Sequence, residues 1–263
     1  MTPDDIALAH ALADAAGAAI RPWFRRPFLV ETKEDFSPVT IADREAEAAI
    51  RQLLAEHRPD DGVIGEEYGE DRADATRVWV LDPIDGTRAF VAGRPLFGTL
   101  IALMEEGVPV LGVIDQCIIG DRWIGGANHP TTLNGQRAHV RGCDGLAAAR
   151  LGTTGPFLFD AGDLARVDAL RGNVADSLFG GDCHNYGLLA SGHLDLVVES
   201  WLKIHDWAAL VPIVTGAGGV MTDWSGAPLR EGSDGRVIAA GDARVAEAAR
   251  AVLTSASARS NTL

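Results

Sequence analysis

The chain has 263 residues, of which 47% are hydrophobic, so it can bury a sizeable core as one large domain or two small ones. Its 23 basic and 37 acidic side chains give a formal net charge of −14, which disfavours nucleic acids and anionic membrane surfaces as partners. A phosphorylated substrate would therefore have to be received by bound cations rather than by a basic patch.

The three cysteines, Cys117, Cys143 and Cys183, are far apart and lack C-x-x-C spacing. This pattern is typical of reduced thiols and favours neither a disulfide framework nor a zinc site. The sequence also starts without a basic and apolar signal segment, and no stretch is apolar and long enough to span a bilayer. We therefore expect a cytoplasmic protein.

The first expected elements are a helix, a strand and a loop. Thr2 and Pro3 form a favourable helix start, and apolar residues recur at helical spacing over residues 6–20. Residues 30–32 favour a strand, and the polar, proline-bearing residues 33–40 suit a loop that can open and close.

Thr40 begins the second expected helix, which extends to about His57. Asp43 stands three residues after Thr40, where a capping box places an acid, so capping alone would explain its presence. Glu47 precedes Arg51 by four residues, a spacing that stabilises a helix through an ion pair.

Two short strands are expected to bring acidic residues to one edge of a sheet. Residues 63–67 contain Glu66 and Glu67, and residues 78–82 end at Asp82. In open α/β sheets, ligands bind at the carboxyl ends of the strands. We take Glu67 as a solvated residue or a neighbour of the site rather than a ligand.

The segment WVLDPIDGTRAF, residues 79–90, carries two carboxylates close together, Asp82 and Asp85. Like charges this close raise each other's pKa unless a cation lies between them, and a divalent metal ion is the usual cation. Gly86 permits an unusual backbone geometry, and the N–H groups of Gly86 and Thr87 would face an anion. The D-P-x-D-G sequence is also typical of a surface turn, so this segment alone leaves both interpretations open.

From Gly98 onward the pattern predicts antiparallel strands joined by tight turns, with Asn134 and Gly135 in the turn of a later hairpin. This meander completes an α+β half that covers residues 1–142. Residues 143–263 then alternate strands and helices, which predicts a layered α/β half.

Asp206 is expected to open a helix of this second half, where it would act as an N-cap that stabilises the helix by roughly 1 kcal/mol. A helix N-terminus also favours an anion and metal cluster, so the two roles are compatible. His205 beside it is assigned no catalytic role. Three tryptophans of this half, Trp201, Trp207 and Trp224, are expected to pack in the core rather than to stack on an imidazole ring of a ligand.

Three motifs carry a resemblance to a known family. The segments GEE (65–67), LDPIDGT (81–87) and HDWAALVPIVTGAGG (205–219) resemble, in order and spacing, the motifs of the inositol monophosphatase family of metal-dependent phosphomonoesterases. KEDFSPVTIADREAE (33–47) resembles the mobile loop and helix of that family. The sequences DGTRAF, GRPLFGTLIAL and GGDCHNYGLLASGHLDLVVE most resemble the histidinol-phosphate phosphatase branch.

The resemblance implies an α+β and α/β layered sandwich of the inositol-monophosphatase/sugar-phosphatase type, with two subdomains and a homodimeric assembly. It further implies a phosphomonoesterase that uses two or three Mg²⁺ ions per site and acts on a small-molecule phosphate monoester. Carboxylate and carbonyl ligands without a Cys or His cluster fit Mg²⁺ better than zinc or copper.

The family's site residues transfer to this sequence one by one. The implied metal ligands are Glu66, Asp82, the carbonyl of Ile84, Asp85 and Asp206, with Asp82 shared between two ions. Glu66 and Thr87, backed by Asp43, would polarise the attacking water. The N–H groups of Gly86 and Thr87 would hold the phosphate oxygens.

Specificity is expected to come from the far end of the pocket. Glu199, seven residues before Asp206, and Asp182 are the acids that would attract a cationic leaving group. Arg88 would bind the substrate or a neighbouring acid, and Lys33 would belong to the mobile loop. Each of them could instead be a solvated or ion-paired surface residue.

The expected activity is hydrolysis of L-histidinol phosphate to L-histidinol and phosphate, a step of histidine biosynthesis. The alternatives are an inositol-1-monophosphatase, a broad-specificity small-molecule phosphatase, or an enzyme that acts on 3′-phosphoadenosine 5′-phosphate. From a different class comes a non-catalytic, metal-binding regulatory protein with the same fold.

Overall fold

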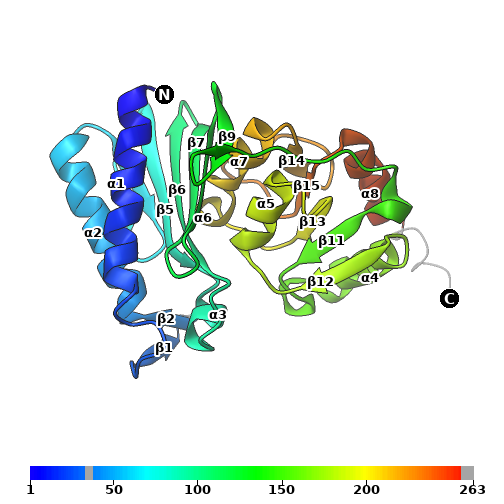
Figure 1. Cartoon of the computed structure of the whole chain (residues 1–263), viewed down its shortest axis with the longest axis horizontal. Coiled ribbons are helices and arrows are strands. Elements are labelled where there is room, and N and C mark those ends of the chain that lie inside the picture. The colour runs from blue at the N-terminus through cyan, green and yellow to red at the C-terminus, as the bar shows by residue number, and fades with distance from the viewer. Residues whose placement is uncertain (33–37, 256–263) are drawn as a thin grey trace.

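The structure is a computed structural model of the chain, in which residues 1–32 and 38–255 are described (Figure 1). Helices and sheets alternate in stacked layers, so the expected layered sandwich of mixed helices and sheets is confirmed. Within the described ranges, no helix is both long and apolar enough to cross a bilayer.

Helices α1 (Pro3–Ile20) and α2 (Ile41–His57) form the outer layer on the left of Figure 1. Both begin with a capping box, formed by Thr2 with Asp5 and by Thr40 with Asp43; the second of these was predicted, and for the first only the capping role of Thr2. The apolar face of each helix packs on the first sheet, in a core that includes Trp79. The Glu47–Arg51 ion pair on α2 is also present.

The first sheet has the strand order β10-β9-β8-β7-β6-β5-β3-β4, and β5 to β10 form the predicted antiparallel meander. Asn134 and Gly135 have φ values of 50° and 78°, as a tight hairpin turn requires. Strand β3 runs parallel to β5, so the carboxyl ends of these two strands share one edge. The strands are β3 (Gly62–Gly65), β4 (Gly69–Asp71), β5 (Arg77–Asp85), β6 (Gly98–Glu105), β7 (Val108–Gln116), β8 (Asp121–Gly126), β9 (His129–Leu133) and β10 (Gln136–Arg137).

Some local expectations for the first half were wrong. Residues 33–40 were expected to be a loop throughout, but Pro38–Thr40 forms strand β2, which pairs antiparallel with β1 (Val30–Thr32). Main-chain pairing with β1 outweighs the turn signal of the proline, which occupies the end of the strand, where it is tolerated. Strand β4 was not predicted, because its sequence Gly-Glu-Asp is polar and fully exposed.

The second sheet has the order β12-β11-β13-β15-β14, with helices α4 and α8 on its outer face. Helices α5, α6 and α7 lie between the two sheets and close the central core. The elements are 3₁₀ turns Leu146–Ala148 and Pro156–Leu158, strands β11 (Arg150–Thr153), β12 (Asp176–Phe179), β13 (Leu196–Glu199), β14 (Val220–Asp223) and β15 (Val237–Ala240), and helices α4 (Ala161–Arg171), α5 (Cys183–Ala190), α6 (Ile204–Trp207), α7 (Leu210–Gly216) and α8 (Ala243–Ser255).

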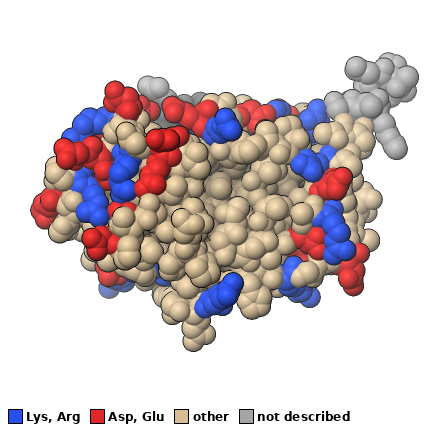
Figure 2. Space-filling view, turned by 90° about the horizontal axis from the view of Figure 1, so that it is seen from above, with Lys and Arg blue, Asp and Glu red and all other residues tan. Residues whose placement is uncertain are grey.

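The first sheet ends at Arg137 and the second begins at Arg150, while the division at residue 142 stays a prediction. Figure 2 shows a face on which acidic and basic side chains lie side by side at both ends of the molecule, with other residues in the centre. All three cysteines are free thiols, and Cys143 and Cys183 are buried.

Candidate active site

The carboxyl end of strand β5 carries Asp82 and Asp85, and an irregularity in the strand turns both toward the same side. Residues three apart on a regular strand point to opposite faces. Between Asp82 and Asp85 the pairing with β6 shifts by one residue, so that Ile84 enters the core beneath α1 and α2. This bulge leaves Asp82 and Asp85 on the face that looks toward α6.

Asp206 reaches these two acids from helix α6 in the second half of the chain. Carboxylate oxygens of Asp82, Asp85 and Asp206 all lie within 4.8 Å of one another. The expectation that Asp206 opens a helix was wrong, because α6 begins at Ile204 and Asp206 is its third residue. Its Oδ2 instead accepts a hydrogen bond from the N–H of Lys203 at 2.6 Å, so it still caps this helix.

Burial and mutual repulsion raise the pKa values of these acids. Burial is the largest cause for Asp82 and Asp85, and the charges of Glu66 on Asp82 and of Asp182 on Asp85 add to it. Burial likewise raises the pKa of Asp206, which the nearby His205 lowers in part. The N–H of Cys183 donates to Asp85 Oδ2 at 2.6 Å, which offsets only part of this cost.

The donor set fits a hard divalent cation. It consists of crowded carboxylate oxygens, those of Asp82 buried and those of Asp85 and Asp206 half-buried, an arrangement that is unfavourable until positive charge is placed among them. Glu66 follows strand β3 at the same edge and is close enough to raise the pKa of Asp82. Glu66, Asp82, Ile84, Asp85 and Asp206 line one cavity of ≈ 150 Å³.

Asp43 and Thr87 meet beside this cluster. Asp43 Oδ2 accepts the capping hydrogen bonds of Thr40, from its N–H at 2.8 Å and its hydroxyl at 2.6 Å. The other oxygen, Oδ1, lies 3.5 Å from the Thr87 hydroxyl, which also donates to the carbonyl of Ile84 at 3.0 Å. Asp43 therefore caps α2 and faces Thr87 at the same time. Burial, with a contribution from Glu66, raises its pKa to about 6.

Gly86 joins β5 to helix α3 (Thr87–Val91) in a conformation that other residues avoid. Its φ is 88°, and a Cβ atom here would lie 3.1 Å from the carboxyl group of Asp182. Glycine thus lets the chain turn sharply and lets Asp182 approach. Gly86, Thr87 and Arg88 line the acidic cavity, and the first N–H groups of a helix have no partners inside that helix.

Glu47 is a supporting residue whose role sequence reasoning missed. Its side chain is fully buried and accepts hydrogen bonds from the N–H groups of Glu67 at 2.8 Å and Tyr68 at 3.2 Å. It thereby holds the turn that follows Glu66, and its ion pair with Arg51 compensates its charge. The i,i+4 spacing revealed the ion pair, but nothing in the sequence links Glu47 to the distant residues 67–68.

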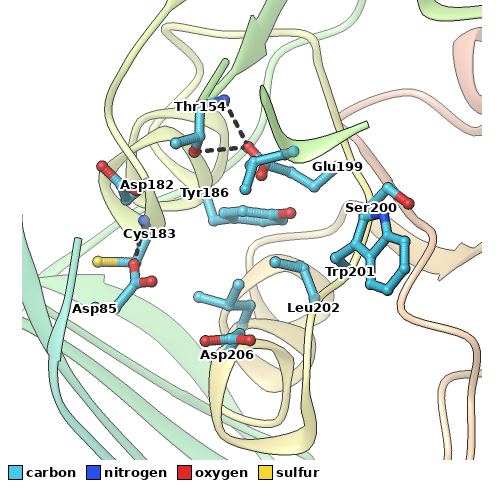
Figure 3. A pocket seen from close by; sticks show the side chains of 12 residues that line it. Asp85, Thr154, Asp182, Cys183, Tyr186, Glu199, Ser200, Trp201, Leu202 and Asp206 are labelled. Carbon is cyan, nitrogen blue, oxygen red and sulfur yellow. Dashed lines mark hydrogen bonds between the residues drawn. The ribbon is translucent and has the colours of Figure 1, made fainter. Parts of the chain in front are cut away.

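A second cavity of ≈ 140 Å³ adjoins the first and carries the predicted substrate acids (Figure 3). Glu199 ends strand β13, and its Oε1 accepts hydrogen bonds from the N–H of Thr154 at 2.8 Å and its hydroxyl at 3.0 Å. Asp182 lies on the other side of the cavity. Burial, followed by the charge of Asp182 among others, raises the pKa of Glu199 to about 8.

Arg88 lies near Asp182 and over the ring of Phe157, 5.4 Å from its centroid. Burial and the charge of Asp206 raise the pKa of Asp182 to about 6, and Arg88 moderates this rise. Lys33, the expected loop residue, lies outside the described residues.

The expectation that the three tryptophans are core residues is confirmed for two of them. Trp207 and Trp224 are 2% and 5% exposed, whereas Trp201 is 67% exposed, so its assignment to the core was wrong. Trp201 contributes instead to the wall of the second cavity.

The model of the "Inositol monophosphatase family" matches residues 3–258, almost the whole chain. The chain belongs to this family. It is accordingly a phosphoric monoester hydrolase. Enzymes of this family use metal ions, and Asp82, Asp85 and Asp206 form an acidic cluster that could hold one.

The names of similar proteins in the inositol monophosphatase family state more than one activity. The chain is 47% identical to the "Bifunctional phosphatase IMPL2, chloroplastic" of Arabidopsis thaliana, over 91% of this chain and 72% of that protein. It is 39% identical to a histidinol-phosphatase of Chlorobaculum parvum, over 86% and 88% of the two chains. The structure of an inositol monophosphatase from Zymomonas mobilis superposes with a TM-score of 0.89 and 55% identity, over 95% and 98% of the two chains.

The raised pKa values predict that the metal-free protein loses stability as the pH rises from 6 to 8.5. The pKa values of Asp43 and Asp182 are about 6 and that of Glu199 about 8, against 3.8 and 4.5 in the unfolded chain. The native state therefore holds protons that the unfolded state has released, and its stability falls through this window. Thermal denaturation in a chelator should give a Tm that decreases with pH, and a steadily rising Tm would contradict the assignment.

Proposed function

We propose that this phosphatase hydrolyses L-histidinol phosphate to L-histidinol and phosphate and depends on Mg²⁺. The observation that carries the proposal is the pair of acids in the cavity beside the acidic cluster, the buried Glu199 and the half-buried Asp182. Histidinol carries an ammonium group, which such acids would attract. The relative named as a histidinol-phosphatase supports the same substrate.

The proposed metal ligands are those of the acidic cluster and its neighbours at the end of β5. Ions bound there would neutralise the phosphoryl oxygens, lower the pKa of a water molecule and stabilise the leaving oxygen. Two or three Mg²⁺ ions suit this set, because Mg²⁺ prefers oxygen ligands and retains several of its waters. The ligands are Glu66, Asp82, the carbonyl of Ile84, Asp85 and Asp206.

The residues of the chain itself would orient the reacting groups. The N–H groups of Gly86 and Thr87, at the start of α3, would hold the phosphate oxygens. Glu66 and the Thr87 hydroxyl would orient the attacking water, and Asp43 would accept a hydrogen bond from Thr87. Because Asp43 is held by the Thr40 cap, this orientation is built into the start of α2.

At the opposite end, Glu199 would bind the ammonium group of the leaving alcohol. Its Oε1 is already occupied by Thr154, which leaves Oε2 for a ligand. Asp182 would add a second negative charge, with Arg88 fixing its position. A homodimer, which the family resemblance implies, stays a prediction.

An inositol phosphate is the second candidate substrate, since a 55% identical structure is that of an inositol monophosphatase. Purified protein assayed with Mg²⁺ on L-histidinol phosphate and on inositol 1-phosphate decides between the two. We expect kcat/KM to be at least about tenfold higher for histidinol phosphate, the ratio that one charge-assisted contact provides. Faster hydrolysis of inositol 1-phosphate would overturn the proposed substrate while leaving the phosphatase chemistry intact.

A further inference from the structure

The hydroxyl group of Tyr186 is buried without a partner. Tyr186 lies on α5 and is 2% exposed, and within the described part of the chain its hydroxyl makes no hydrogen bond. Buried polar groups in native proteins are almost always hydrogen-bonded, so an exception calls for an explanation such as a missing ligand. Burying a hydroxyl in this way costs free energy that phenylalanine would not.

Tyr186 is one of the residues that line the cavity holding Glu199. Figure 3 shows the Tyr186 ring crossing the middle of that cavity between Glu199 and Asp206, with its oxygen directed toward Ser200 and Trp201. Leu202 lines the same cavity. A ligand that enters beyond the phosphate position would therefore meet this hydroxyl.

Trp201 provides a second, independent observation at the same cavity. Its φ of 66° lies in the left-handed region, which is unfavourable for a bulky side chain, and its indole is largely exposed rather than packed. The N–H of the next residue, Leu202, donates to the carbonyl of Gly235 at 3.1 Å and helps to hold this backbone in place. Strained residues of this kind cluster at sites that clamp a ligand.

We propose that Tyr186 and Trp201 select the leaving group of the phosphate ester. The Tyr186 hydroxyl hydrogen-bonds a ring nitrogen of the leaving group, and the exposed indole stacks on a flat ring such as an imidazole. The inference rests on the proposed function, in that it assigns the second cavity to the leaving alcohol. Glu199 and Asp182 attract the amine of the leaving group, and Tyr186 and Trp201 add two contacts with its ring.

The test compares two substrates that share an amine and a phosphate but differ in the ring. L-Histidinol phosphate carries the imidazole, whereas O-phosphoethanolamine lacks it. We expect Tyr186→Phe and Trp201→Gly each to raise the KM for histidinol phosphate by about tenfold, the effect of one hydrogen bond or stacking contact, with kcat within about twofold. The KM for O-phosphoethanolamine should change by less than about twofold in both variants.

The Tm separates recognition from folding. Tyr186→Phe removes an unpaired hydroxyl and Trp201→Gly removes a strained side chain, so neither should lower the Tm appreciably. Tyr68→Phe is the matched control, because Tyr68 is 52% exposed and lies outside the cavity. Unchanged KM values, or equal increases for both substrates, would overturn the inference.

A different result would overturn the proposed function instead. If the wild type ignores histidinol phosphate and hydrolyses inositol 1-phosphate, the proposed substrate is wrong. The contacts with a flat, nitrogen-containing ring are then overturned too, and only the claim that Tyr186 contacts the leaving group is left, which is decided by whether Tyr186→Phe raises the KM for inositol 1-phosphate relative to O-phosphoethanolamine.

Discussion

Replacing Asp82 by asparagine is expected to lower kcat by a factor of at least about 10³ for every phosphate ester, equivalent to about 4 kcal/mol of transition-state stabilisation. Asp82 is fully buried at the centre of the acidic cluster, and Asp85, Asp206 and Glu66 all raise its pKa after burial itself. Asparagine keeps the shape and can still accept the hydrogen bond that the N–H of Ile84 donates at 3.0 Å. Only the charge is lost, and with it the affinity for shared cations.

The same substitution should have the opposite effect on the stability of the metal-free protein. Removing one of several repelling carboxylates should keep or raise the Tm in a chelator. Saturating Mg²⁺ should raise the Tm of the wild type. At a hundredfold excess of Mg²⁺ over its Kd, the free energy of unfolding should increase by about 2.7 kcal/mol, and both increases should be much smaller in the variant. Rates of phosphate release and thermal denaturation with and without Mg²⁺ measure both effects.

Asp61→Asn is the matched control for Asp82→Asn. Asp61 is also a buried acid, but it lies at the opposite end of β3 and β5, where it accepts a hydrogen bond from the Trp79 indole at 2.9 Å. This change should cost stability and leave kcat within about twofold. Wild-type activity in the Asp82→Asn variant would show that the acidic cluster is not required for catalysis.

Replacing Glu199 by glutamine is expected to change the choice of substrate rather than abolish the reaction. Glutamine keeps an oxygen for the two hydrogen bonds from Thr154, so the strand end should remain ordered. The loss of charge removes a charge-assisted contact with an ammonium group, worth about 1.5–3 kcal/mol. The kcat/KM for histidinol phosphate should therefore fall by about 10- to 100-fold, and that for inositol 1-phosphate by less than about fivefold.

Measurements of the Tm test whether the Glu199→Gln variant remains folded. The pKa of Glu199 is raised to about 8 by burial, so glutamine should not lower the Tm at pH 8 in a chelator. Glu231→Gln, an exposed glutamate of the same half, should change neither substrate. Equal losses for the cationic and the neutral leaving group would show that Glu199 does not discriminate between them.

Much of the fold follows from local patterns in the sequence. The caps at Thr2 and Thr40, the Asn134–Gly135 turn and the alternation of the second half predict their elements correctly, because each depends on residues a few positions apart. The exceptions depend on distant partners. Strand β2 exists because β1 pairs with it, and polar β4 because β3 does.

The candidate site divides in the same way. Motif resemblance identified Asp82, Asp85 and Asp206, and the structure brings their oxygens together. Glu47 and Tyr186 were not identified, since a buried glutamate that caps a remote turn and a hydroxyl without a partner are visible only in three dimensions. Trp201 was assigned to the core because a sequence does not reveal that a tryptophan has a positive φ.

The bulge in β5 makes the length of the segment between Asp82 and Asp85 as important as the two acids themselves. Inserting one residue there while the bulge is kept would rotate Asp85 toward the apolar layer beneath α1 and α2, and deleting one would remove the extra residue that carries Ile84 into that layer. Point substitutions at positions 83 and 84 should consequently be tolerated over evolutionary time more often than any insertion or deletion. Natural variants of this enzyme are expected to differ in the identity of the residues between Asp82 and Asp85 but never in the number of those residues.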